Sequence, residues 1–241
     1  MELSKRLKSV ADMVTKGSKV ADIGCDHGYV SIYLVKENLA MDVIAMDVNK
    51  GPLECARQNV EREGLAQYIE LRLSDGLKAL SAGEVNSIIC AGMGGRLVVK
   101  ILTEGKAVLS KVRELILQPQ SEIQLVRKFL YENGFEIVQE NMVLDDGKYY
   151  QMMRAVKGES QQGDLGEPSS EVISITEVEA KYGPCLLKNQ HPVLKEFLLL
   201  EKNKYEGILL ELQKTNPDKT GELSQRCLLI KEALTRYGYE V

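Results

Sequence analysis

Short apolar runs alternate with stretches of helical spacing over the first 134 residues. The runs predict strands at 19–23, 42–46, 69–73, 85–90 and 114–117. The stretches predict helices at 2–16, 29–38, 51–63, 96–104 and 121–132. Continuous apolar runs are typical of strands buried on both faces, and parallel strands need a crossover helix between them. The repeated β/α order therefore predicts an α/β domain built on a parallel sheet.

The pattern changes after Gly134. Two apolar segments, 135–144 and 149–156, flank a turn with Asp-Gly at 146–147, which predicts an antiparallel hairpin. Five β/α repeats followed by such a hairpin differ from the plain dinucleotide-binding pattern. They are typical of the Rossmann-like sheet of class I methyltransferases, in which the final strand is reversed. We therefore expect that fold for residues 1–157.

The rest of the chain is of a different kind. Residues 158–175 are polar and rich in glycine, which predicts a linker. Residues 176–241 carry two stripes of apolar residues at spacings of three and four, separated by Asn216-Pro217. They predict a C-terminal α-helical hairpin resembling a coiled coil. Whether the stripes pair with each other or with another subunit, and hence the oligomeric state, stays open.

Composition narrows the function classes only slightly. The 241 residues carry a net charge of −4, which is not the strong basic balance of many nucleic-acid binders, although a local basic patch remains compatible with it. Five scattered cysteines without a C-x-x-C pair, together with two histidines, predict no metal site. No apolar stretch approaches 18 residues, so we expect no membrane span and a cytoplasmic location.

Candidate chemistry begins where the first strand ends and a glycine-containing loop follows, in Asp22-Ile23-Gly24-Cys25-Asp26-His27-Gly28. Loops at the carboxyl ends of parallel strands bind nucleotide-like cofactors. The dinucleotide fingerprint G-x-G-x-x-G would need glycine at 26 and 29, where this chain has Asp26 and Tyr29. An aspartate there would repel a pyrophosphate. S-adenosylmethionine has no phosphate and carries a sulfonium and an ammonium group, so the loop favours that cofactor.

Three acids lie at or just after the ends of successive predicted strands. Asp47 is placed to accept both ribose hydroxyls, and Asp75 to receive the adenine amino group while Gly76 lets the backbone approach. Asp22 is placed to meet the ammonium group directly or through water. A single such acid is often only a helix cap, but three together predict a cofactor site. The predicted cofactor-binding residues are Asp22, Gly24, Cys25, Gly28, Asp47, Val48, Asn49, Asp75, Gly76, Ala91, Gly92 and Met93.

The fourth strand leads into Ala91-Gly92-Met93-Gly94-Gly95. Enzymes that methylate an exocyclic amino group of a base typically carry an Asn- or Asp-Pro-Pro-aromatic sequence at this place. A glycine run fits close approach of the backbone to a flat group. A tight loop that merely clears the cofactor is equally compatible with it.

A family resemblance rests on five segments: 21–28 (ADIGCDHG), 47–53 (DVNKGPL), 91–95 (AGMGG), 118–120 (QPQ) and 146–150 (DGKYY). Together they resemble the bacterial tRNA (adenine-N1)-methyltransferases that act on the D-arm adenine at position 22. The resemblance is close over residues 3–156 and looser over the helical tail, a coiled-coil appendage that in the family is implicated in holding tRNA. It implies methyl transfer from S-adenosylmethionine to adenine N1, with tRNA as the partner.

The implied reaction suggests roles near the loop. N1 has a lone pair but is normally base-paired, so the base must be exposed or flipped. A carboxylate that accepts the amino N–H would orient the ring and stabilise the developing positive charge. Asp26 is our candidate, with His27 and Tyr29 beside the base; a purely structural role for Asp26 is equally compatible. Weaker substrate-binding candidates are Arg6, Gly94, Gly95, Tyr149 and Tyr150, although sheet packing is favoured for the tyrosines.

Two other functions stay open. One is a methyltransferase of a small molecule or protein, with the helical tail as a lid or dimer contact. The other is a non-catalytic S-adenosylmethionine-binding protein whose helical hairpin is the functional surface. Methyl transfer to unmodified tRNA separates both from the first function.

Overall fold

The computed structural model describes residues 3–158, 175–215 and 220–240. The chain divides into two compact units, Met1–Ile173 and Ser174–Val241. In the first unit the strands are β1 (Ser18–Ile23), β2 (Ala40–Asp47), β3 (Ile69–Leu73), β4 (Ser87–Gly94), β5 (Glu114–Ser121), β6 (Phe135–Asp145) and β7 (Lys148–Lys157). Its helices are α1 (Lys5–Ala11), α2 (Tyr29–Lys36), α3 (Lys50–Arg62), α4 (Gly95–Glu104), α5 (Lys106–Leu109) and α6 (Ile123–Glu132).

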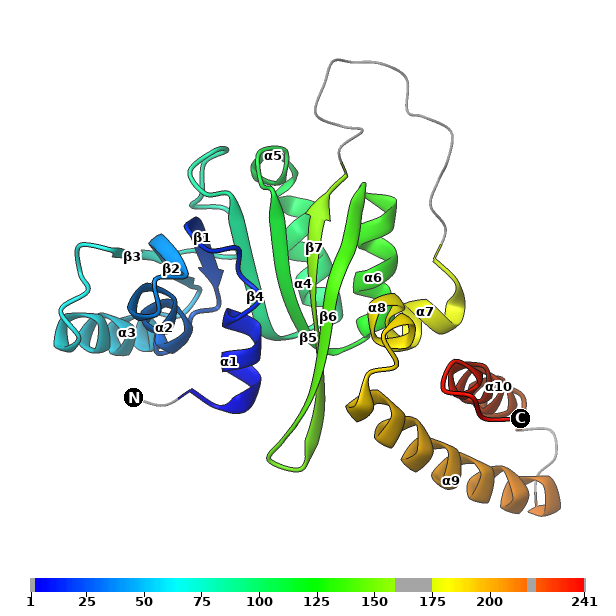
Figure 1. The fold of residues 1–241 in the computed structure, drawn as a ribbon. Coiled ribbons are helices and arrows are strands. Elements are labelled where there is room, and N and C mark those ends of the chain that lie inside the picture. Colours follow the sequence, from blue (N-terminus) through cyan, green and yellow to red (C-terminus); the bar gives the residue numbers. More distant parts are fainter. Residues whose placement is uncertain (1–2, 159–174, 216–219, 241) are drawn as a thin grey trace, which may run out of the picture. The chain divides into compact units, whose positions relative to one another are not determined.

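The seven strands form one sheet in the order β3-β2-β1-β4-β5-β7-β6 (Figure 1). The first five strands in this order pair in parallel, and β7 runs antiparallel between β5 and β6. This topology confirms the predicted Rossmann-like methyltransferase sheet with a reversed final strand. Strand order reverses between β1 and β4, and open α/β sheets bind ligands outside the carboxyl ends of strands at such a point.

Helices cover both faces of the sheet. On one face, α1, α2 and α3 share a buried core with strand residues such as Val20, Ile89 and Ile116. The helices α4 and α6 pack against each other and lie behind the sheet in Figure 1. Burial of apolar side chains on both faces explains why the central strands are continuously apolar in sequence.

The first helix is shorter than the predicted 2–16, because it ends at Ala11. The backbone N–H and the hydroxyl of Thr15 donate to the two carboxylate oxygens of Glu114, at 3.0 and 2.7 Å. Glu114 in turn pairs with Arg154 of β7 at 2.8 Å. These bonds hold Thr15 outside the helix and attach the first segment of the chain to the sheet.

The fourth strand is longer than predicted. It extends through the glycine run to Gly94, pairing Ala91 with Gln118 and Met93 with Pro119 of β5. The register is irregular around Gly92, whose φ is 80°. The run at 91–95 is therefore an irregular strand end rather than a free loop, and it continues directly into α4.

A buried ion pair fixes the hairpin to α6. Arg127 is fully buried; its Nε lies 2.8 Å from Glu140 of β6, and its Nη2 donates to Gln151 of β7 at 2.6 Å. A buried charge is tolerated only when it is paired and hydrogen-bonded. This contact holds β6 and β7 together at one edge of the sheet.

The second unit contains α7 (Glu177–Tyr182), α8 (Pro184–Lys188), α9 (Pro192–Thr215) and α10 (Gly221–Thr235). The long helices α9 and α10 pack together, and buried Glu201 of α9 accepts from Tyr182 at 3.1 Å and pairs with Arg226 of α10. The short helices α7 and α8 were not distinguished in the sequence. Most of the predicted linker and the break at 216–217 lie outside the described residues. Within those residues, no helix is both long and apolar enough to cross a bilayer.

Candidate functional site

Three predicted segments meet at the carboxyl edge of the parallel strands. Ile23, at the end of β1, pairs with Met46 of β2 on one side and Cys90 of β4 on the other. The residues that follow each of these positions are therefore neighbours. This places the loop after β1 between Asp47 and the β4 end at 91–94.

The loop after β1 turns sharply against β2. The backbone N–H groups of Gly24 and Cys25 donate to the carbonyl of Met46 at 2.8 and 2.9 Å. Positive φ values of 72° at Gly24 and 75° at Gly28 favour glycine at both positions. A Cβ on Gly24 would also strike the side chain of Met93. The loop and the β4 end are therefore in close contact.

Asp47 organises this edge through its carboxylate. It is 8% exposed and accepts the backbone N–H of Asn49 at 2.8 Å and that of Asp26 at 3.2 Å, one on each oxygen. An ionised carboxylate has about four acceptor positions. Two positions therefore remain for a pair of hydroxyl donors, while the neighbouring Val48 is exposed.

Asp22 is buried beneath the loop. The hydroxyl of Ser31, in the first turn of α2, donates to its Oδ2 at 2.7 Å. Burial raises the pKa of Asp22 to about 6, although the Ser31 hydrogen bonds oppose this shift and the charge of Asp47 adds to it. Burial likewise raises the pKa of the Cys25 thiol, which stays protonated and serves as a packing group.

Asp75 lies near the end of the neighbouring strand. The backbone N–H of Ser74 donates to the carbonyl of Asp47 at 2.9 Å, which joins the ends of β2 and β3. The Asp75 carboxylate is exposed and pairs with Lys78, which lowers its pKa. Gly76 has a φ of 60°, and a Cβ there would lie 3.1 Å from Ile101 of α4. Asp75 is thus at the predicted edge, but a ligand amino group would compete with Lys78.

The three residues predicted to act on the substrate occupy the exposed side of the loop. The side chain of Asp26 is 69% exposed, its backbone has a φ of 51°, and Oδ1 lies 3.6 Å from Nε2 of His27. The rings of His27 and Tyr29 stack with centroids 5.5 Å apart. Asn59 of α3 donates to the carbonyl of His27 at 3.0 Å and so supports this turn.

Arg6 and Tyr150 also meet at this edge of the sheet. The guanidinium of Arg6 lies 5.3 Å from the centroid of the Tyr150 ring, and Tyr150 packs against the core. Tyr149 is half-buried and precedes Tyr150 in β7, so the two side chains point to opposite faces of the sheet.

The predicted substrate-binding residues Gly94 and Gly95 lie against the end of β5. A Cβ on Gly94 would lie 3.2 Å from the Ser121 hydroxyl, and a Cβ on Gly95 would strike the backbone of 121–122. Packing between the ends of β4 and β5 therefore accounts for these glycines.

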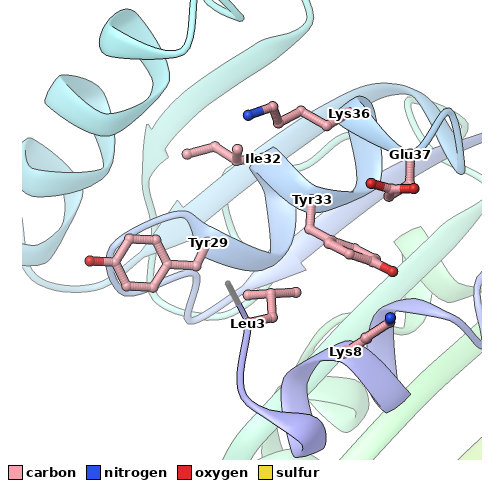
Figure 2. A pocket seen from close by; sticks show the side chains of 7 residues that line it. All are labelled: Leu3, Lys8, Tyr29, Ile32, Tyr33, Lys36 and Glu37. Carbon is pink, nitrogen blue, oxygen red and sulfur yellow. The ribbon is translucent and has the colours of Figure 1, made fainter. Parts of the chain in front are cut away.

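A cavity of ≈ 220 Å³ lies beside this site, between α1 and α2 (Figure 2). Its lining residues are Leu3, Lys8, Tyr29, Ile32, Tyr33, Lys36 and Glu37. Tyr33 extends toward α1, where its hydroxyl donates to Asp12 at 2.9 Å. The cavity shares only Tyr29 with the predicted catalytic set.

The residues at the edge fit S-adenosylmethionine better than a phosphate-bearing cofactor. Asp22, Asp26 and Asp47 concentrate negative charge around a loop whose segment 22–29 contains no lysine or arginine. That charge opposes a pyrophosphate and attracts a sulfonium or ammonium group. The remaining acceptor positions of Asp47 suit ribose hydroxyls.

Sequence reasoning assigned no role to three side chains that support the site. Ser31 holds Asp22, Asn59 holds the loop carbonyl, and Gln118 accepts from Arg6 at 2.7 Å. Ser31 and Gln118 are fully buried. Polar residues within apolar periodic stretches are the signal that would have drawn attention to them, because buried polar groups need partners.

Comparison with known proteins agrees with this geometry. Residues 3–153 match the methyltransferase domain family. The tRNA (adenine(22)-N(1))-methyltransferase of Bacillus subtilis (strain 168) is 33% identical over 97% of this chain and 98% of its own length. The crystal structure of the B. subtilis m1A22 tRNA methyltransferase has a TM-score of 0.81 and 32% identity, covering 97% of this chain and 99% of that one.

Two further structures contain a relevant ligand. A Streptococcus pneumoniae protein in complex with S-adenosyl-L-methionine has a TM-score of 0.82 and 35% identity, covering 97% of this chain and 100% of that one. M. capricolum TrmK in complex with S-adenosyl-homocysteine has a TM-score of 0.81 and 26% identity, covering 98% and 99%. Because the relationship to the curated B. subtilis enzyme extends over nearly the whole of both chains, this chain belongs to the tRNA (adenine(22)-N(1))-methyltransferase family.

Proposed function

We propose that this protein transfers a methyl group from S-adenosylmethionine to N1 of adenine 22 in tRNA. The observation that carries the proposal is the acid-lined edge at β1 and β2, with the exposed Asp26 and the partly exposed His27 and Tyr29 directly beside it. The names of the relatives supply the base and its position. A tRNA substrate also leads us to expect a cytoplasmic location.

In this proposal, the chain holds the cofactor through its strand-end acids. Asp47 accepts the two ribose hydroxyls with the acceptor positions that Asn49 and Asp26 leave open. Asp22 attracts the ammonium group, directly or through water, and Asp75 receives the adenine amino group in exchange for Lys78. The backbones of Gly24, Gly28, Gly76 and 91–93 allow close approach of the ligand. S-Adenosylmethionine supplies an electrophilic methyl group when bound.

Substrate activation needs little proton chemistry. The N1 lone pair is the nucleophile and the product ring is a cation, so no base has to remove a proton. Asp26 accepts the adenine amino N–H, orients N1 and stabilises the developing charge, since its carboxylate is exposed on the surface of the loop. His27 and Tyr29 offer stacked ring faces against which an extruded base packs. The dominant contribution of the protein is therefore positioning and exclusion of water.

We also propose that residues 1–157 form the methyltransferase domain, 158–175 a linker and 176–241 a separate helical hairpin. The division into two compact units near residue 173 supports this arrangement. At least part of the apolar stripes predicted in 176–241 packs within the second unit, because α9 and α10 contact each other.

Cofactor binding is expected to weaken as the pH falls through about 6. The pKa of Asp22 is raised to about 6, so its carboxylate is charged above this value and loses its attraction for the ammonium group below it. The dissociation constant of S-adenosylmethionine, measured by calorimetry between pH 5 and 8, should rise by up to about tenfold per pH unit below 6. Asp22→Asn should bind weakly with no such inflection; the same inflection in this variant would exclude Asp22 as its origin.

The function is tested by incubating the protein with labelled S-adenosylmethionine and unmodified tRNA, then mapping the methylated nucleoside. The expected product is N1-methyladenosine at position 22. Methyl on an exocyclic nitrogen would contradict the choice of nucleophile. Absence of transfer to any tRNA pool would favour the small-molecule, protein or non-catalytic alternatives, which screening of those substrate classes then separates.

A further inference from the structure

Half-buried Arg6 lies near the carboxyl end of β5, and within the described residues no carboxylate forms an ion pair with its guanidinium. Nη1 of Arg6 donates to Oε1 of Gln118 at 2.7 Å. The nearby carboxylate of Asp145 accepts from the backbone N–H of Arg6 at 3.0 Å rather than from its guanidinium. Because Gln118 is neutral, its hydrogen bond fixes the guanidinium without cancelling the charge.

The orientation of this guanidinium is set by residues from β5 and β7. Gln118 is fully buried, and its Nε2 donates to the carbonyl of Pro119 at 3.3 Å, which fixes its oxygen toward Arg6. The Tyr150 ring faces the guanidinium at 5.3 Å, within the range of a cation–π contact. Arg6 is therefore preorganised, so a ligand would not have to order a long flexible side chain.

The guanidinium and a second donor flank one glycine of the β4 end. A Cβ placed on Gly92 would lie 3.6 Å from Nη1 of Arg6 and 3.8 Å from Nε2 of Gln120. Gln120 is exposed, so its amide is accessible from solvent. Two N–H-bearing groups, one of them cationic, thus converge beside Gly92. Convergent donors with a planar guanidinium are suited to bind an oxyanion such as a phosphate.

We infer that Arg6 and Gln120 bind a phosphodiester group of tRNA next to the target adenosine, and that Gln118 and Tyr150 are positioning residues for Arg6. This inference rests on the proposed function. The adenine ring itself is not the ligand of the guanidinium, because methylation at N1 makes the ring a cation and the two positive charges repel. A phosphodiester carries the opposite charge and lies within one nucleotide of the base.

The inference is tested with Arg6→Gln and Gln118→Glu in steady-state methylation of unmodified tRNA at several salt concentrations. Arg6→Gln removes the charge, whereas Gln118→Glu keeps the size and the acceptor but pairs Arg6 with a carboxylate. Each variant should raise the KM for tRNA by about tenfold and reduce the slope of log KM against log salt by roughly 0.7–0.9, the value for one phosphate contact. The kcat and the dissociation constant of S-adenosylmethionine should stay within about twofold of the unaltered protein.

Arg113→Gln is the matched control, since Arg113 is exposed and precedes β5 at its opposite, amino end. It should leave KM and the salt slope unchanged. Thermal unfolding of all three variants establishes that each is folded at the assay temperature. If Arg6→Gln and Gln118→Glu match Arg113→Gln, or lower kcat at constant KM, the phosphate site is wrong while the proposed function stands. If the unaltered protein methylates no tRNA, the proposed function fails and this inference fails with it.

Discussion

Asp47→Ala is expected to raise the dissociation constant of S-adenosylmethionine by at least about 100-fold. In the proposed complex Asp47 accepts two ribose hydroxyls, and hydrogen bonds to charged groups contribute about 1.5–3 kcal/mol each. Each is thus worth roughly tenfold or more in affinity. The same carboxylate holds the backbone N–H groups of Asp26 and Asn49, so the variant also loosens both neighbouring loops. Isothermal titration calorimetry measures the loss directly.

Two further variants make this result specific. Asp47→Asn keeps one acceptor oxygen, so its affinity for S-adenosylmethionine should fall by about tenfold. This value lies between those of the unaltered protein and Asp47→Ala. Asp42→Ala removes an exposed aspartate from the other end of β2, where it pairs with Lys19, and should leave the affinity unchanged. If Asp47→Ala and Asp42→Ala have the same dissociation constant for S-adenosylmethionine, Asp47 does not bind the ribose of the cofactor.

Asp26→Asn is expected to reduce the rate of methyl transfer to tRNA by about 100-fold or more. The variant removes the charge that would stabilise the cationic product, and removal of one such group typically costs about 10²–10³ in kcat. Asparagine tolerates the positive φ of 51° at this position, so the loop should keep its shape. The dissociation constant of S-adenosylmethionine should stay within about threefold. Single-turnover transfer with saturating tRNA is the measurement.

Asp146→Asn is a close control for that experiment. Asp146 is also an exposed aspartate with a positive φ, 47°, but it lies in the turn between β6 and β7. Asp146→Asn should transfer methyl groups to tRNA at the same rate as the unaltered protein. Full transfer by Asp26→Asn would leave Asp26 with a structural role only. Loss of S-adenosylmethionine affinity in Asp26→Asn would instead assign Asp26 a role in cofactor binding.

The strands of the sheet were predictable because their environment is uniform. Strands such as β1 and β4 are buried on both faces, so their apolar runs do not depend on which neighbour they meet. The acids at the strand ends were predictable for a related reason. Parallel strands bring their carboxyl ends to one edge, so Asp22 and Asp47 become neighbours whatever the loops between them do.

Features that depend on a single distant partner were not predictable. The spacing of 2–16 favours a helix throughout, but the helix ends at Ala11 and Thr15 donates hydrogen bonds to Glu114 instead. The glycine run at 91–95 resembles a loop in sequence, yet β5 pairs with it as far as Gly94. In the same way, the orientation of Arg6 depends on Gln118, 112 positions away. Local propensity carries no information about such partners.

The attachment of α1 to the last hairpin also constrains how a newly made chain matures. The bonds from Arg6 to Asp145 and from Arg154 to Thr15 each join residues 139 positions apart. Ribosomes add about 5–20 residues per second, so the beginning of the chain waits roughly 7–28 s for these partners to be synthesised. The guanidinium of Arg6 can reach its final orientation only after β7 has been inserted beside β5. A nascent chain can therefore complete the edge that contains Arg6 only when the whole first unit, including β7, has left the ribosome.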